Sequence, residues 1–236
     1  LLLLELIPYV TIFLFGIVVG SFLNVCIYRL PEGESIVKVP SHCMSCGAKL
    51  RWFDLIPLFS WLFLRGRCRQ CKAVISVQYP VVEAVNGILW VAVFLVNGMN
   101  GMSVLYSLMA SALLTLSVID WRTFEIPFGI NVFLGVLGVV AVFLEKEEWR
   151  SRLIGAVCVS GVLFVLYLLS KGRAIGGGDI KLMAVSGLFL GAAPTVCAMF
   201  IGLVTGGGYG AYMLISKKLD RKDHFAFGPF LAFGLA

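Results

Sequence analysis

The sequence is poor in charge. Asp, Glu, Lys and Arg together make up 14% of its 236 residues, whereas soluble domains carry about 25%. The hydrophobic fraction is 60%, and apolar runs of about 18 or more residues recur along the chain, which predicts a polytopic helical membrane protein. The net charge is +6. In so apolar a chain, Lys and Arg are typical of residues that orient spans in the bilayer, so we do not expect nucleic acid as a partner.

Three other patterns are missing. No internal repeat is evident, and no Gly-x-Gly-x-x-Gly lies in a strand-turn-helix setting, which excludes a Rossmann-type cofactor pocket. The first apolar run is too long for a cleavable signal and has no small-residue cleavage site. The chain does not begin with Met, so we expect it to start inside a longer N-terminal segment.

The apolar runs predict about eight transmembrane helices. A long polar loop at 29–78 follows the first of them, which predicts three parts: a first helix (1–28), a loop domain (29–78) and a membrane core (79–236). The expected spans cover residues 6–28, 79–97, 102–119, 126–144, 153–170, 180–193, 194–215 and 225–236.

The distribution of Lys and Arg predicts the orientation. Sixteen of them lie in the loops 29–78, 120–125, 171–181 and 216–224, and three lie in the opposite loops. The positive-inside rule therefore places the long loop on the cytoplasmic side. Asp120 and Asp179 lie at the ends of spans on that same side.

Asp179 follows three consecutive glycines, Gly176 to Gly178, at the start of an apolar segment. A glycine run indicates backbone that bends sharply or lies close to another group, and an acid at such a place is a candidate functional residue. The other aspartate near an apolar span is Asp120. We hypothesise that the two meet and share a proton, so that one activates water while the other donates a proton. The alternative is that Asp179 caps a helix and Asp120 is an interfacial charge.

Four of the seven cysteines form two Cys-x-x-Cys pairs in the long loop. Cys43 and Cys46 are separated from Cys68 and Cys71 by 21 residues, the spacing of a four-thiolate zinc site. A closed shell of four cysteines predicts a structural metal rather than a catalytic one. The alternatives are two redox dithiols or chance, and His42 beside the first pair is expected to be a bystander.

Between the two pairs lies an apolar stretch, Trp52 to Leu64, that is too short to span a bilayer. We interpret it as an interfacial segment with its tryptophans at headgroup depth, or else as the core of a small zinc domain. Asn24, Glu83 and Asn86 are polar residues inside spans. Glu83 lies shallow enough to snorkel, which favours an interfacial role over one that lines a cavity or holds substrate.

These motifs together resemble the bacterial type IV prepilin peptidases, membrane aspartic proteases of the Gly-x-Gly-Asp class. The resemblance rests on Asp120 with Ile126-Pro127, and on the run from Gly176 to Leu182. It extends over nearly the whole chain. The other matching motifs are Ser21-Phe22-Leu23-Asn24-Val25, Arg29-Leu30-Pro31, the cysteine loop with Asp54-Leu55-Ile56-Pro57 and Arg65-Gly66-Arg67-Cys68, Tyr79-Pro80, Glu83, and Phe227-Gly228-Pro229-Phe230.

The resemblance implies an enzyme of the bacterial inner membrane that removes the leader of type IV prepilins or type II secretion pseudopilins at the cytoplasmic face. It carries the catalytic role over to Asp120 and Asp179, and the zinc ligands to Cys43, Cys46, Cys68 and Cys71. Members with the four-cysteine loop commonly also methylate the new N-terminus, with S-adenosylmethionine as methyl donor. The sequence assigns no residue to that cofactor and does not indicate the oligomeric state.

Two alternatives belong to other classes. The first is a proton-coupled transporter in which the two aspartates form a relay and the glycines break a helix. The second is a non-enzymatic assembly factor of a pilus or secretion system that uses the cysteine loop as a docking module.

Overall fold

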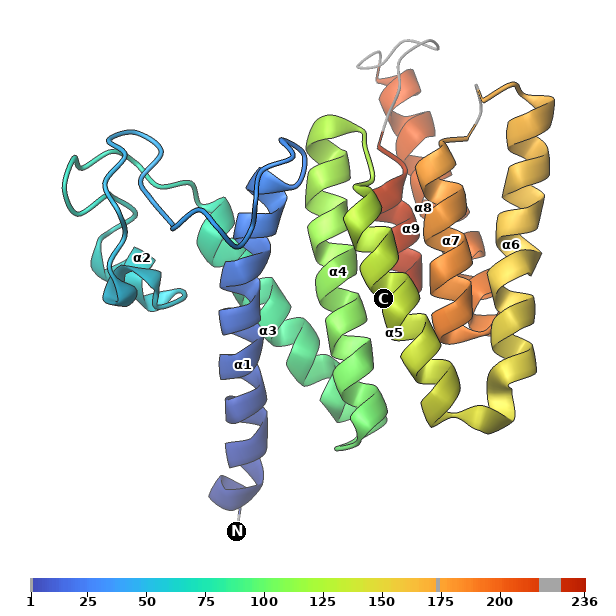
Figure 1. Cartoon of the computed structure of the whole chain (residues 1–236), viewed down its shortest axis with the longest axis horizontal. Helices are drawn as coiled ribbons and strands as arrows, with labels where there is room; N and C mark the ends of the chain where they lie inside the picture. Colours follow the sequence, from blue (N-terminus) through green and yellow to red (C-terminus); the bar gives the residue numbers. More distant parts are fainter. Residues whose placement is uncertain (1, 173–174, 217–225) are drawn as a thin grey trace. The chain divides into compact units, whose positions relative to one another are not determined.

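The structure is a computed structural model that describes residues 2–172, 175–216 and 226–236 (Figure 1). These residues form helices joined by short connections and one long loop, which confirms the all-helical prediction. The chain divides into two compact units, Leu1–Ser111 and Ala112–Ala236, and the boundary falls inside α4. The helices are α1 (Leu2–Arg29), η1 (Trp52–Leu55), α2 (Phe59–Phe63), α3 (Gln78–Asn97), α4 (Gly101–Thr123), α5 (Phe128–Leu144), η2 (Lys146–Glu148), α6 (Trp149–Leu169), α7 (Gly177–Leu190), α8 (Ala192–Ile215) and α9 (Gly228–Leu235).

Five helical stretches within the described residues are long and apolar enough to cross a membrane, and they make the chain a multi-pass membrane protein. They comprise Glu5–Arg29, Gln78–Asn97, Gly101–Thr123, Lys146–Leu169 and Ala192–Ile215. α5 is also apolar but shorter, at 17 residues. Five of the basic residues that predict the orientation, Arg173, Lys217, Lys218, Arg221 and Lys222, lie outside the described residues.

In the first unit, α1 and α3 pack closely and run antiparallel. A Cβ on Gly16 would lie 2.7 Å from the Cα of Gly87, and a Cβ on Gly20 would lie 2.7 Å from the Cα of Glu83. Small residues four apart let two membrane helices approach backbone to backbone. The pairing of Gly16 with Gly87 and of Gly20 with Glu83 fixes the register of the two helices.

Polar groups of α1, α3 and the first part of α4 bond to one another. The amide of Asn86 donates to the carbonyl of Gly16 at 2.7 Å and accepts from the hydroxyl of Ser111 at 2.8 Å. The indole of Trp90 donates to the same hydroxyl at 2.9 Å. In hydrocarbon an unpaired polar group is costly. This network therefore favours the one packing of the first unit in which these polar groups are all paired.

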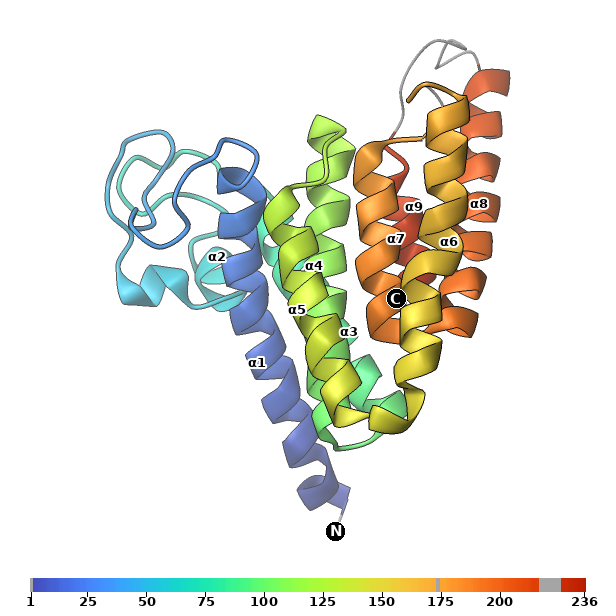
Figure 2. The same cartoon turned by 45° about the vertical axis from the view of Figure 1, so that its right-hand side comes forward.

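In the second unit, α7 is the central helix and contacts α5, α6 and α8 (Figure 2). α6 and α7 cross where Gly155 meets Gly187: a Cβ on Gly187 would lie 2.1 Å from the carbonyl oxygen of Gly155. On the other side, α5 presents Gly135 and Gly138 to Val185 and Leu188 of α7. Glycines on both neighbours therefore hold α7 tightly, and with it the acid in its first turn.

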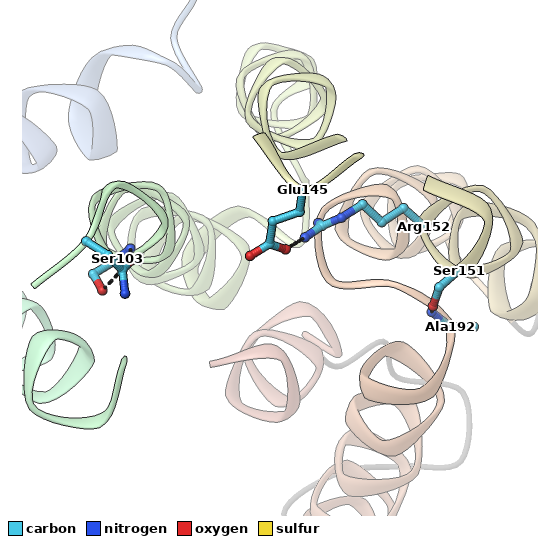
Figure 3. A network of polar contacts seen from close by, with 6 residues as sticks. Ser103, Glu145, Ser151, Arg152 and Ala192 are labelled. Atoms are coloured by element: carbon cyan, nitrogen blue, oxygen red, sulfur yellow. Dashed lines mark hydrogen bonds and ion pairs between the residues drawn. The ribbon is translucent and has the colours of Figure 1, made fainter. Parts of the chain in front are cut away.

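The end of the second unit away from Asp179 is fixed by polar contacts (Figure 3). Arg152 near the start of α6 is 1% exposed and pairs with Glu145 after the end of α5. Ser151 accepts a hydrogen bond from the backbone N–H of Ala192, the first residue of α8, at 3.3 Å. Arg152 is, with Lys146 and Arg150, one of the three cations in the loops predicted to lie opposite the cysteine loop, and its burial makes it a structural residue of the α5–α6 connection.

Candidate active site and metal centre

Asp179 lies in the first turn of α7 and is 9% exposed. Gly176 is the N-cap residue of the helix, and its backbone bonds to the Asp179 carboxylate. The glycine run is part of the helix start and not a broken helix. The space around it explains the glycines: a Cβ on Gly176 would lie 3.2 Å from Asp179 Oδ2, and one on Gly178 would lie 3.1 Å from the Cβ of Ile126, whereas Gly177 faces open space.

Asp120 lies in the last turn of α4 and is 5% exposed. Its Oδ2 accepts a hydrogen bond from the backbone N–H of Gly228 at 2.9 Å. Gly228 is the first residue of α9, so the positive end of that helix points at the carboxylate. A Cβ on Gly228 would lie 2.7 Å from the same oxygen. Glycine is therefore the residue that lets α9 approach Asp120.

The two acids lie in the same compact unit and interact electrostatically. They come from helices separated by 53 residues of sequence, and each receives a backbone N–H from a glycine motif. The chemistry open to a buried pair of carboxylates is proton sharing, with water activation by one member and proton donation by the other.

Aromatic residues fix the motif that holds Asp120. The ring of Phe227 packs on Gly206 of α8, where a Cβ would lie 2.7 Å away. The ring centres of Phe230 and Tyr209 are 5.2 Å apart, and those of Tyr209 and Trp121 are 5.8 Å apart. Trp121 directly follows Asp120 in α4. The aromatic contacts thus tie α4, α8 and α9 together around this acid.

One buried polar residue of α5, a helix that packs on α7, does not stand out in the sequence. Asn131 lies on the side of α5 that faces α7, between Phe128, whose ring lies 5.6 Å from the Lys181 ammonium, and Gly135, which packs on Val185. It is 4% exposed, and neither atom of its amide has a hydrogen-bond partner among the described residues. A single Asn in an apolar run gives little signal in a sequence, because many such residues bond to their own helix.

Ser186 gives the same observation on α7 itself. It is fully buried, and its hydroxyl has no partner in the described part of the chain. It lies seven residues after Asp179, which is two helical turns, so the two side chains lie on one stripe of α7. Ser186 therefore adds an unpaired polar group to the helix that carries Asp179, and Asn131 adds another to the neighbouring α5.

The four loop cysteines come together as the spacing predicts. Their Sγ atoms all lie within 4.8 Å of one another, so they could hold a metal ion. Cys43 and Cys71, from different pairs, have sulfurs 3.8 Å apart. That is close to the roughly 3.8 Å edge of a tetrahedron built from Zn–S bonds of about 2.3 Å. The donors and their spacing therefore fit zinc, and His42 contacts the carbonyl of Pro40 instead of joining the cluster.

The two cysteine pairs sit on equivalent turns. The N–H of Cys43 donates to the carbonyl of Ala48 and that of Cys68 to Ala73, at 2.9 and 2.8 Å. Four residues after the first cysteine of each pair, the backbone has positive φ, at Gly47 (69°) and Lys72 (60°). The long loop thus contains the same local structure twice, with one pair of thiols on each copy.

The turns also tune the thiols electrostatically. The backbone N–H groups of Cys46 and Ser45 point at the sulfur of Cys43 and lower its pKa to about 6. The N–H of Ala73 acts in the same direction on Cys71, but partial desolvation and the thiols of Cys68, Cys46 and Cys43 raise its pKa to about 11. Four thiols at this spacing cannot all ionise by themselves. A divalent cation would remove that conflict, because metal ligands must be thiolates.

Glu83 does not snorkel, and the prediction of a shallow exposed side chain is wrong. The residue is 6% exposed, and its Oε2 accepts the backbone N–H of Leu58 at 2.7 Å. The alternative in which Trp52 to Leu64 forms the core of a small domain is wrong as well, because no residue of η1 or α2 is buried.

The geometry defines a class: a multi-pass helical membrane protein with a buried pair of acids and a four-cysteine loop. Comparison with known proteins gives the family. Residues 14–97 match the bacterial Peptidase A24 N-terminal domain, and residues 107–211, which include Asp120 and Asp179, match the type IV leader peptidase family. The chain belongs to the type IV leader peptidase family.

Curated relatives agree with this assignment. The chain is 32% identical to a prepilin leader peptidase/N-methyltransferase of Bacillus subtilis, over 94% of this chain and 90% of that protein. Proteins of the same name from Burkholderia pseudomallei (32% identical, 93% and 81% covered) and Myxococcus xanthus (36%, 89% and 64%) also match. The chain thus spans less than two thirds of the length of the Myxococcus relative. No solved structure matches. Membership of this family does not favour the transporter or the non-enzymatic assembly factor.

Proposed function

We propose that the protein is a membrane aspartic endopeptidase that removes the leader of type IV prepilins or pseudopilins. The observation that carries the proposal is that the buried Asp120 and Asp179 are close enough to interact electrostatically. Both acids are buried, lie in one compact unit, and fall inside the region that matches the type IV leader peptidase family. The relatives' name, prepilin leader peptidase/N-methyltransferase, supports the choice of substrate.

In the proposed reaction the pair holds one proton. The carboxylate removes a proton from a water molecule that attacks the scissile carbonyl, while the protonated partner donates its proton to the carbonyl oxygen. As the C–N bond breaks, the acid that took the proton from water gives it to the leaving amine, and its partner takes a proton back from a hydroxyl of the tetrahedral intermediate. The N–H of Gly228 fixes Oδ2 of Asp120, so that its other oxygen can face the water. Because both acids are buried, bulk water does not weaken their electrostatic effect on the reacting groups.

The proposed setting is the cytoplasmic face of the bacterial inner membrane. The excess of Lys and Arg on the side of the cysteine loop supports that orientation. α5, α7 and α9 would lie in the membrane with the five longer spans, which gives eight in all. α7 has 14 residues and reaches about 21 Å, less than the roughly 30 Å hydrocarbon core. Asp179 would therefore lie below the membrane surface, within reach of a substrate helix that lies in the bilayer.

We further propose that Cys43, Cys46, Cys68 and Cys71 bind one structural zinc ion, and that residues 29–78 form a zinc-binding loop domain inserted before the membrane core of residues 79–236. The name of the relatives supports a second activity, N-methylation of the new N-terminus. S-adenosylmethionine would supply the methyl group, and the residues that bind it are unassigned.

The test is incubation of purified protein in proteoliposomes with a prepilin and S-adenosylmethionine, followed by mass analysis of the product's N-terminus. We expect loss of the leader, and addition of one methyl group to the new N-terminus. Asp120→Asn and Asp179→Asn should each leave the prepilin uncut. Uptake of a solute without cleavage would support a transporter instead, and neither activity would support an assembly factor.

A further inference from the structure

The segment Trp52–Phe63, which comprises η1, a turn at Leu58 and α2, exposes its apolar side chains. Trp52 and Phe63 are 78% and 84% exposed, and Phe59 and Leu62 are exposed as well. Soluble surfaces rarely carry a contiguous apolar patch of this kind, and such patches mark a partner or a membrane. The exposed apolar side chains therefore indicate that the segment contacts an apolar partner or a membrane.

The segment lies beside α1, not beyond its end. Trp52, Leu55, Ile56 and Pro57 line a groove of about 490 Å³ whose other wall is a stretch of α1, residues 18–25. Both views draw η1 and α2 alongside the half of α1 that ends at Arg29 (Figures 1 and 2). At 1.5 Å per residue, this stretch lies about 6 to 16 Å from Arg29 along the axis of α1. It therefore belongs to the part of the helix that crosses the membrane.

The turn at Leu58 has a strained backbone. Its φ of 60° and ψ of −53° are those of a γ-turn with positive φ, and the N–H of Phe59 lies 2.6 Å from the carbonyl of Pro57. Such turns are rare, and a non-glycine residue keeps one only where the surroundings enforce it. Glu83 holds Leu58 in this conformation, because its buried carboxylate accepts a hydrogen bond from the Leu58 N–H at 2.7 Å.

The position of Glu83 explains why an acid is needed there. It faces Gly20 across the α1–α3 contact, at the depth of the groove, and Ser21 of α1 also bonds to its carboxylate. At membrane depth, an irregular turn must find hydrogen-bond partners in the protein, because lipid offers none. Glu83 provides that partner for the N–H that the turn directs away from the bilayer.

Charges at both ends of the segment suit a lipid headgroup layer. Arg51 precedes η1, and Arg65 and Arg67 follow α2. The one acid of the segment, Asp54, is paired with Arg69 at 2.8 Å. The ends are thus positive while the middle is apolar, the distribution of an interfacial element that binds anionic membranes.

From this geometry we propose that Trp52–Phe63 is a membrane-inserted element, seated in the leaflet on the Arg29 side of α1, with Glu83 as the residue that holds it there. Its apolar side chains lie among acyl chains, continuous with the lipid-facing surface of α1, and its flanking arginines lie at anionic headgroups. The proposal does not depend on the peptidase activity.

The test is tryptophan fluorescence of the full chain in nanodiscs of phosphatidylethanolamine and phosphatidylglycerol. Subtracting the emission of Trp52→Phe from that of the unmodified protein isolates Trp52. We expect brominated acyl chains to quench this difference signal and aqueous iodide not to quench it. Trp61 packs on Gly66 of the loop and donates a hydrogen bond to the carbonyl of Ile75. The difference signal obtained in the same way with Trp61→Phe should therefore be quenched less by brominated acyl chains than that of Trp52.

Two outcomes would overturn the proposal, and two others would each overturn one part of it. Quenching of Trp52 by iodide and not by bromolipid would place the segment in water, and quenching by neither would place it against protein, including a second copy of the chain. Equal bromolipid quenching of Trp52 in nanodiscs without phosphatidylglycerol would show that the flanking arginines do not need anionic headgroups to hold the segment in the membrane. Glu83→Leu should shift Trp52 toward iodide quenching, whereas Glu83→Gln, which keeps an oxygen acceptor, should not. Equal quenching in both variants would remove Glu83 from the proposal.

Discussion

Replacing Gly228 with Ala tests whether the start of α9 fixes Asp120 for catalysis. The added Cβ would lie 2.7 Å from Oδ2 and 3.1 Å from Cγ of Asp120. A Cβ atom does not approach a non-bonded oxygen that closely, so the carboxylate and the helix must separate. The hydrogen bond from the Gly228 N–H, now 2.9 Å long, would then weaken or break. Gly228 does not have positive φ, so the effect comes from contact and not from backbone strain.

The expected loss follows from the kind of bond that is affected. A hydrogen bond to a charged group contributes about 1.5–3 kcal/mol. At about 1.4 kcal/mol for each factor of ten, Gly228→Ala should lower kcat for leader cleavage by about 10- to 150-fold. KM should change little, because the altered group acts on the reacting atoms and not on the bulk of the substrate.

The assay is steady-state cleavage of a prepilin by protein in proteoliposomes, with thermal unfolding measured in parallel. Gly207→Ala in α8 is the matched control, because a Cβ there would meet nothing within 4 Å, and it should cleave normally. Normal cleavage by Gly228→Ala as well would refute the reasoning. So would a loss that is fully accounted for by a lower unfolding temperature.

Three further changes give distinct outcomes. Asp120→Asn and Asp179→Asn should each lower cleavage by at least about 10²- to 10⁴-fold, the range of general acid–base catalysis, while leaving the unfolding temperature near that of the unmodified protein; turnover by either variant would argue against the pair. Cys43→Ser should lose bound zinc in metal analysis by inductively coupled plasma mass spectrometry, because one ligand of a closed shell is removed, and an equal zinc content in both proteins would rule the site out. Asn131→Leu should raise the unfolding temperature, since it replaces two unpaired buried polar atoms, yet lower kcat if the amide serves the site; unchanged kcat would make Asn131 purely structural.

Local sequence was sufficient for the helices, the cysteine cluster and the family. Long apolar runs specify membrane helices whatever they pack against. Each Cys-x-x-Cys pair lies on its own turn, built by bonds such as that of Cys43 to Ala48, so its geometry is set within a few residues. The acids also stood out in the sequence, because charges are rare at the ends of apolar spans.

Contacts between distant residues decided the rest. The bond from Gly228 to Asp120 joins positions 108 residues apart, and that from Leu58 to Glu83 joins residues 25 apart. The sequence shows that Glu83 lies near the end of its span, which is why an exposed side chain was expected. It does not show that the backbone N–H of Leu58 bonds to the Glu83 carboxylate. The glycines beside Asp179 follow the same logic. Their sequence indicates that something is close, and only packing reveals that Ile126 and the carboxylate itself occupy the space.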